Sequence, residues 1–290
     1  MIDFIFEGEA KQFPQNWQEV KPSLLPVLLK KLFVESESPT TYHELLRLNL
    51  EYSTRQWRRF CKKYFSESLT DEKRERNAEL LAFLLGRLSW MWSDPLSVQP
   101  FEWVRIGGKP FLLPDAQLKT MTYGELTDSY IHMRAYVDQL EKGEKRLNLL
   151  LSTICRPEVS AFNYKEDPFW DGDPREAYNE HVAEGRVELW EGVGLEKKIP
   201  ILLFYVSILK DLVAAYQIYE EDSEQPAIEE EYPGQGFVKN TYLLAEKGVF
   251  GNVNQTRQAN AHAVLLFLEE YKKDEEYKEK LRQEAERKTR

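Results

Sequence analysis

Residues 101–157 constrain the fold more than any other part of the chain. The run FEWVRIGGKPFLLP places an apolar segment on either side of Gly107-Gly108. Two glycines suit a two-residue hairpin turn, because that turn requires positive φ angles. Thr122 and Glu125 then form a capping-box pattern, which predicts a helix start. The region is therefore predicted to hold a β-hairpin over about 101–113, a helix from 122 to about 140 and a second helix over 144–155.

Helical spacing of apolar residues extends through most of the remaining chain. A second capping-box pattern, Thr41 with Glu44, predicts another helix start, with Thr41 as the N-cap. The alternating residues 1–7 fit a short strand or arm. The predicted fold class is mainly α: a multi-helix globular protein with one small β-hairpin and that short N-terminal strand. Further helices are predicted over 27–34, 53–66, 72–92, 174–190, 199–219, 236–248 and 256–273.

The pattern divides the chain into three regions. Residues 1–95 form an N-terminal helical region, and 96–270 hold the hairpin and a helical core. We expect these two to pack as one unit. Residues 271–290 form a charged helical tail without a continuous apolar stripe. Such a tail is either a solvated extension or a segment that a partner orders.

Charge and cysteine content limit the function classes. The net charge of −10 argues against a general nucleic-acid coat, because phosphate contacts require clustered cations. Cys61 and Cys155 lie in apolar helical patterns and are predicted to be buried, reduced thiols. The first residues lack the pattern of a signal peptide, so a cytoplasmic location is the default. Lys210 and Asp211 interrupt the apolar stretch 199–219, which favours a core helix over a membrane span.

The clearest amphipathic pattern lies in residues 53–66. Trp57, Phe60, Cys61 and Tyr64 share one helical face. Three interpretations of the opposite, cationic face remain open: a solvated face offset by acids such as Glu51, Glu67, Asp71 and Glu72, a surface for an acidic protein partner, or a nucleic-acid surface. The cations of that face are Arg55, Arg58, Arg59, Lys62 and Lys63.

Metal-ligating and catalytic patterns are sparse. The four histidines are far apart, without the spacing of a zinc site. Asp167, Asp171 and Asp173 fit turn chemistry, and a calcium or magnesium site is the alternative. An enzyme or metal-binding site within 163–181, including Arg175 and His181, therefore stays open as a second hypothesis. No cofactor is predicted.

Three runs carry a resemblance to a group of proteins: GGKPFLLPDAQLKTMTYGELTDSY, LNLLLSTICRP and LAEKGVFGNVNQT. They resemble phage and prophage virion-morphogenesis proteins of Bacteroidetes-type hosts, particularly tail-assembly-chaperone-like ones, over about residues 100–270. In that pattern Gly107, Gly108 and Lys109 match a hairpin, Thr122, Gly124 and Glu125 a helix start, and Arg156-Pro157 a helix end. The chain departs from the pattern at Ile154-Cys155 and in the long 158–198 region, which leaves the exact partner open.

The resemblance implies a non-enzymatic, phage-derived assembly protein that acts by protein–protein contacts, as a tail-assembly chaperone or a minor virion component. Its expected partners are other proteins, such as phage structural components, in the host cytoplasm or the virion. Nucleic-acid binding through the Arg55–Lys63 face is a further alternative. The candidate contact residues are Arg55, Arg58, Arg59, Lys62, Lys63, Trp103, Lys109, Tyr123 and Glu125.

Overall fold

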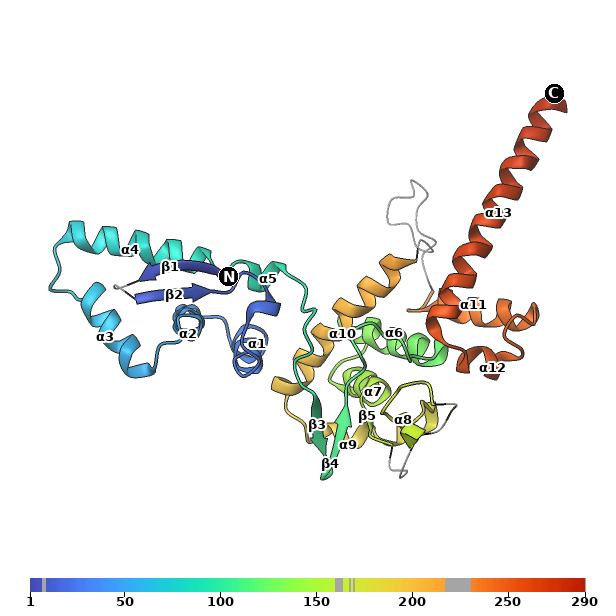
Figure 1. Ribbon diagram of the computed structural model, residues 1–290, viewed down its shortest axis with the longest axis horizontal. Coiled ribbons are helices and arrows are strands. Elements are labelled where there is room, and N and C mark those ends of the chain that lie inside the picture. The colour runs from blue at the N-terminus through green and yellow to red at the C-terminus, as the bar shows by residue number, and fades with distance from the viewer. Residues whose placement is uncertain (7–8, 160–163, 167, 169, 217–230, 290) are drawn as a thin grey trace. The chain divides into compact units, whose positions relative to one another are not determined.

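The computed structural model describes residues 1–290 apart from 7–8, 160–163, 167, 169, 217–230 and 290 (Figure 1). The protein is mainly helical and carries small antiparallel sheets, which confirms the predicted fold class. The chain divides into two compact units. Unit 1 comprises Met1–Phe101 with Gly194–Phe204, and unit 2 comprises Glu102–Val193 with Tyr205–Arg290. The candidate Asp167 and the predicted helix end at 217–219 lie outside the described residues.

Unit 1 begins with a β-hairpin and continues as helices. The predicted N-terminal strand is β1, and it pairs with a second strand in antiparallel register, with Ile2 opposite Phe13. A short 3-10 turn, Trp17–Glu19, follows. The elements are β1 (Ile2–Phe6), β2 (Glu9–Phe13), α1 (Leu25–Phe33), α2 (Pro39–Asn49), α3 (Thr54–Tyr64), α4 (Asp71–Gly86) and α5 (Trp90–Ser93).

Side-chain caps set the starts of α2 and α3. The N-cap of α2 is Ser38, whose side chain accepts a hydrogen bond from the backbone N–H of Thr41, so the prediction of Thr41 as the cap was wrong. Proline at the first helical position explains the earlier start, because a proline there lacks only an N–H that has no helical partner. In α3, Ser53 and Gln56 form a complete capping box.

The interior of unit 1 is built from leucines of α1 and α2 and from two tryptophans. The rings of Trp17 and Trp90 meet edge to face, with centroids 4.9 Å apart. The indole N–H of Trp17 donates to the backbone carbonyl of Asp94 over 3.0 Å. These contacts join the N-terminal part of unit 1 to the end of α5, since aromatic pairs bury large apolar areas.

Unit 2 begins with the predicted hairpin, which forms a three-stranded antiparallel sheet. Strands β3 (Trp103–Ile106) and β4 (Lys109–Leu112) flank Gly107 and Gly108. These glycines have φ angles of +56° and +83°, as the turn requires. The two-residue strand β5 (Arg156–Pro157) adds to β4, with Leu112 opposite Arg156. The segment after the second predicted helix thereby returns to the hairpin.

The helices of unit 2 surround α6, which packs against α7 and α12. The predicted helix over 174–190 was wrong in its first part, because the helix begins only at Glu180, after an extended segment. The predicted 256–273 helix is broken near Asn260 and continues much further. The elements are α6 (Tyr123–Val137), α7 (Lys145–Ile154), the 3-10 turn Tyr164–Glu166, α8 (Glu180–Gly185), α9 (Val187–Glu191), α11 (Gln235–Glu246), α12 (Val253–Gln258) and α13 (Ala261–Thr289).

Helix α10 (Leu195–Ala215) contributes its first part to unit 1 and its second part to unit 2. Ten of its 21 residues are buried, all between Lys198 and Leu212, whereas Lys210 and Asp211 are exposed, as predicted for the wet face of a core helix. Among the described residues, none of the helices has the length and apolar content that a membrane span requires.

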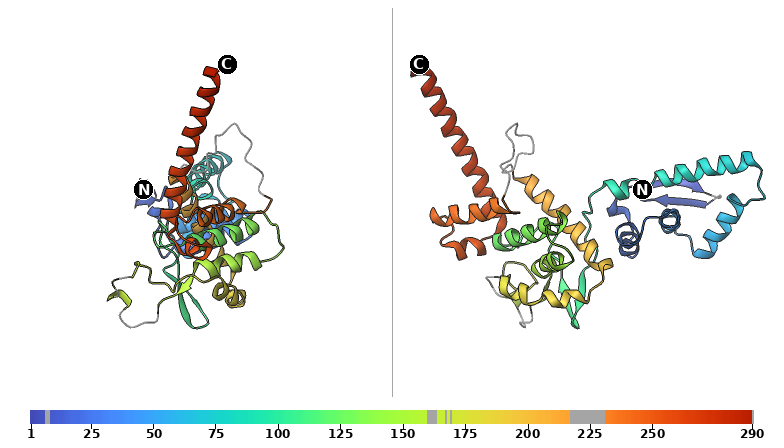
Figure 2. Two further views of the ribbon diagram at one scale, coloured as in Figure 1. Left: turned by 90° about the vertical axis from the view of Figure 1, so that its right-hand side faces the viewer. Right: turned by 180° about the vertical axis from the view of Figure 1, so that it is seen from behind.

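The beginning of α13 is anchored to the rest of unit 2. Backbone bonds join Tyr123 to Ala259 and Ala261 to Met121, and Val264 and Leu268 are buried. From Lys273 to Lys288 every residue is exposed, and Figure 2 shows this part extending away from the other helices of unit 2.

Candidate functional site

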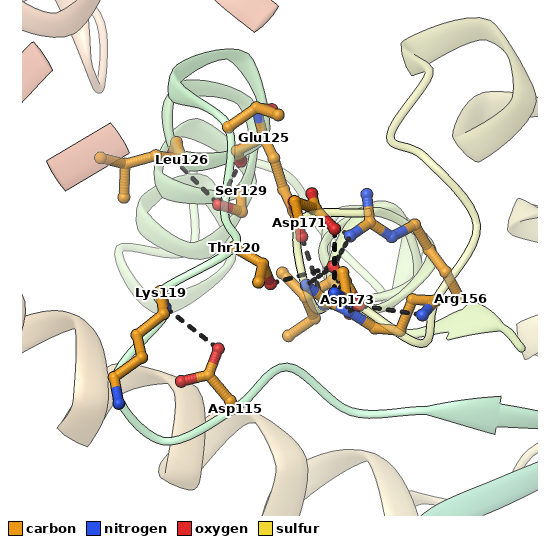
Figure 3. A network of polar contacts seen from close by, with 12 residues as sticks. Asp115, Lys119, Thr120, Glu125, Leu126, Ser129, Arg156, Asp171 and Asp173 are labelled. Carbon is orange, nitrogen blue, oxygen red and sulfur yellow. Dashed lines mark hydrogen bonds and ion pairs between the residues drawn. The ribbon is translucent and has the colours of Figure 1, made fainter. Parts of the chain in front are cut away.

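Unit 2 holds a buried cluster of charged side chains, formed by Glu125, Arg156, Asp173 and Arg175. Figure 3 labels Glu125, Arg156 and Asp173 of this cluster. Glu125 lies in the first turn of α6, Arg156 in β5, and the other two in the extended segment before α8. All four residues are at most 7% exposed. We refer to them as the charge cluster.

Each carboxylate of the charge cluster contacts both guanidinium groups. Oε1 of Glu125 lies 3.4 Å from Nη1 of Arg175, and its Oε2 lies 3.2 Å from Nη2 of Arg156. Oδ2 of Asp173 lies 2.8 Å from Nη2 of Arg175 and 3.2 Å from Nη2 of Arg156. Two acids and two bases therefore balance, which is the condition under which buried charges are tolerated.

Neutral groups add hydrogen bonds to the charge cluster. The Thr120 hydroxyl donates to Oδ2 of Asp173 over 3.1 Å, and Arg175 donates to the carbonyl of Ile154 over 2.8 Å. Asp171 accepts the backbone N–H of Asp173 over 2.9 Å, as the turn interpretation predicts. The Nε and Nη1 atoms of Arg156 have no hydrogen-bond partner among the described residues, and its guanidinium lies 5.9 Å from the centre of the Tyr178 ring.

The surroundings favour the ionised forms of Asp173 and Arg175. Burial opposes ionisation of Asp173, but bonds from Arg175 outweigh it and lower the pKa of that carboxyl. Burial also opposes the charge on Arg175, yet Glu125 and Asp173 together raise its pKa. Burial lowers the pKa of Arg156, with partial compensation from Glu125. The geometry makes the charge cluster an interior clamp that joins α6, β5 and the segment before α8.

A second, half-buried group extends from this clamp. Asp128 accepts a hydrogen bond from the Tyr178 hydroxyl over 2.5 Å and pairs with Arg257 over 2.6 Å. Arg257 also pairs with Glu180 over 2.5 Å. A Cβ atom at Gly124 would lie 3.0 Å from the carbonyl oxygen of Arg257, so α12 approaches α6 closely at this glycine. The group thereby joins α6, α8 and α12.

The structure separates the residues of the hypothesised 163–181 site. Asp173 and Arg175 belong to the charge cluster, and Asp171 supports their turn. The His181 side chain is 82% exposed, beside Glu180 and Glu184. Among the described residues, none of the His, Cys, Asp and Glu side chains gather in threes or more with metal-binding geometry.

The predicted contact residues differ in their exposure. Trp103 and Lys109 are exposed on the β3–β4 hairpin. Tyr123 and Glu125 are fully buried, so their assignment to a contact surface was wrong. The capping-box pattern explains the error with Glu125: Thr122 caps α6 by accepting the N–H of Glu125, but the Glu125 side chain turns inward to the arginines. Sequence spacing around residue 125 contains no signal for these distant partners.

The cationic face of α3 is exposed along its length. Arg55, Arg58, Arg59, Lys62 and Lys63 are exposed, whereas Trp57 and Phe60 are buried. Among the described residues, none of the acids forms an ion pair with Arg55, Arg58, Arg59 or Lys62. Two of the acids that were expected to offset these cations form ion pairs with other residues: Glu51 pairs with Lys21, and Asp71 pairs with Arg74.

A groove in unit 2 was not predicted. Its volume is about 610 Å³, within the range of small-molecule sites. The ring of His262 is held on both sides, because its Nε2 donates to the carbonyl of Gln117 and its Nδ1 accepts from the Tyr216 hydroxyl. The His262 ring is therefore held in place in the lining of the groove. The lining residues are Ala116, Gln117, Lys119, Ile208, Asp211, Leu212, Ala215 and His262.

No protein-family model matches the chain, and no curated protein or solved structure matches it either.

Proposed function

We propose that this protein is a non-enzymatic assembly protein of phage origin, tail-assembly-chaperone-like or a minor virion component, that acts through protein–protein contacts. The observation that carries the proposal is the exposed part of α13, residues 273–288. The motifs at Gly107-Gly108-Lys109, at Thr122 and at Arg156-Pro157 support the phage origin by resemblance.

The exposed part of α13 has the features of a docking helix. Tyr277 and Leu281 are 64% and 48% exposed and lie one turn apart on the same face. A helix this polar depends on side-chain pairs for its stability in isolation. Residues 273–288 and the turn before them contain such pairs: Lys273 pairs with Glu269 and Glu270, and Lys278 pairs with Glu275. These pairs hold the helix extended while its two apolar side chains remain available to a partner.

The charge cluster supports a contact function over chemistry at 163–181. Its carboxylates are held by two guanidinium groups each, and the lowered pKa of Asp173 makes that group a poor proton acceptor near neutral pH. The cluster fixes the scaffold from which α13 and the β3–β4 hairpin extend.

Affinity capture of the tagged full-length protein from infected or lysogenic cells tests the proposal. Wild type should recover a tail, capsid or baseplate component, and Tyr277→Ala/Leu281→Ala should lose it. Val137→Ala/Leu140→Ala is the matched control, because both residues are exposed apolar side chains at the end of α6. Recovery of no virion component, or equal recovery by the Tyr277/Leu281 variant, would contradict the proposal.

A further inference from the structure

We propose that the cationic face of α3 is a docking site for an acidic helical segment of another protein. This surface lies on a different helix from residues 273–288 of α13, so the inference stands whether or not that segment binds a partner.

The spacing of the cations matches a helical partner. The positions i, i+3, i+4, i+7 and i+8, which lie on one helical face, are taken by Arg55, Arg58, Arg59, Lys62 and Lys63. With eleven residues, α3 is about 16 Å long at 1.5 Å per residue. A partner helix of similar length with glutamates at the same spacing can oppose all five cations.

The orientation of α3 is fixed by packing and capping. Trp57 and Phe60 stack with ring centroids 5.0 Å apart and are buried against the rest of unit 1. The Ser53–Gln56 capping box fixes the helix start. The cations are therefore presented on a rigid element, which reduces the ordering cost of a charged interface.

Within the part of the chain that the structure describes, Arg55, Arg58, Arg59 and Lys62 form no ion pair with an acid. Arg58 lies one turn from Lys62, and Arg59 one turn from both Arg55 and Lys63, so like charges adjoin along the whole helix. The helix contains no acid, although the chain as a whole has a net charge of −10. An acidic partner relieves this repulsion, and that gain is available only on binding.

A protein partner fits this surface better than a nucleic acid. The aromatic side chains of α3 pack inward, away from the cations, so they do not provide a platform for base stacking. Beyond α3, exposed acids such as Glu67, Glu72 and Glu75 alternate with exposed cations, so the cationic face does not continue as a uniformly positive track for a phosphate backbone. A short acidic helix would contact only the cations of α3.

Fluorescence anisotropy with the full-length protein tests the inference. The probe is a labelled alanine-based helical peptide with glutamates at i, i+3, i+4 and i+7, and a labelled DNA duplex of similar charge is measured beside it. Wild type should bind the peptide, with affinity falling as salt rises, because the contacts are exposed ion pairs. Arg58→Glu/Arg59→Glu should lower the affinity about tenfold or more.

Lys142→Glu/Lys145→Glu provides the matched control, because it makes the same change in net charge at exposed lysines of unit 2. It should change the affinity less than about twofold, because it leaves every cation of α3 unchanged. Arg58→Gln/Arg59→Gln removes the two charges without reversing them, so it should give an intermediate loss of affinity. If circular dichroism shows that Arg58→Glu/Arg59→Glu does not fold, the glutamine variant takes its place. Absence of peptide binding by wild type, an equal loss in the Lys142/Lys145 control, or tighter α3-dependent binding of the DNA would overturn the inference.

Discussion

Oε1 of Glu125 lies 3.4 Å from Nη1 of Arg175, although 50 residues separate them along the chain and both side chains are almost completely buried. The same carboxylate contacts Arg156 through its other oxygen. One acid therefore compensates parts of two buried cations and joins the first turn of α6 to β5 and to the segment before α8.

Replacing Glu125 by glutamine should strongly destabilise the protein. The change leaves two buried guanidinium groups with one carboxylate between them, and removing one partner of a buried charge pair costs about 3 kcal/mol or more. Urea unfolding at neutral pH measures the free energy of unfolding. Glu102→Gln, at an exposed acid, should change it by less than about 0.5 kcal/mol. An equal, small effect of both variants would show that the charge cluster is not a clamp.

His132 should make the stability depend on pH in the mildly acidic range. Burial, assisted by the nearby Arg146, lowers the pKa of His132 from 6.5 to about 4. The folded state therefore favours the neutral ring, and the unfolded state binds an extra proton between pH 6.5 and about 4. One pKa unit corresponds to about 1.4 kcal/mol of stability, and solvent around the partly exposed side chain weakens the effect. The free energy of unfolding should therefore fall by about 2 kcal/mol as the pH decreases through that window.

The comparison for this prediction is His132→Gln, measured by urea unfolding at several pH values. The variant should have a flatter stability profile between pH 6.5 and 4, while acid unfolding below that window remains because Asp173 still titrates. Parallel profiles for the two proteins would refute the assignment of this window to His132.

Arg59→Glu should stabilise unit 1. The change replaces repulsion with attraction toward Arg55, Lys62 and Lys63, all within one helical turn. Pairs of this kind contribute a few tenths of a kcal/mol each, so the free energy of unfolding should rise by about 1 kcal/mol. Thermal unfolding by circular dichroism at low salt measures it. A decrease would mean that Arg59 has a compensating partner in the fold.

The two cysteines should differ in reactivity. Both are free thiols. Burial raises the pKa of Cys155 to about 12, whereas Cys61 is only half-buried, and its pKa is raised less far. Thiolate is the reactive form, so a thiol reagent should label Cys61 first and Cys155 only after unfolding. Mass spectrometry of the labelled peptides distinguishes the two, and early labelling of Cys155 in the native protein would contradict its complete burial.

Features encoded by neighbouring residues could be predicted from the sequence. The Gly107-Gly108 turn, the Thr122 cap and the inward aromatic face of α3 each depend on a few adjacent positions, and all three are confirmed. Cys61 was predicted to be buried and is half-buried, because it lies at the edge of that face.

Features that depend on contacts distant in the sequence could not be predicted in the same way. The capping-box pattern identified Glu125 as a local cap residue, whereas Arg156 and Arg175 determine where its side chain points. Tyr123 lies against Phe237, more than a hundred residues away, and this contact explains its burial. Such arrangements follow from the packing of α6 against the rest of unit 2.

The proposed function requires that residues 273–288 of α13 contact a partner protein. Photo-crosslinking in infected or lysogenic cells tests this requirement, with benzoylphenylalanine placed at Tyr277 or, as a control, at the exposed Leu140. Position 277 should give a covalent adduct with a tail, capsid or baseplate protein, and position 140 should give none. Adducts that are absent at 277, or that form equally from both positions, would contradict this requirement.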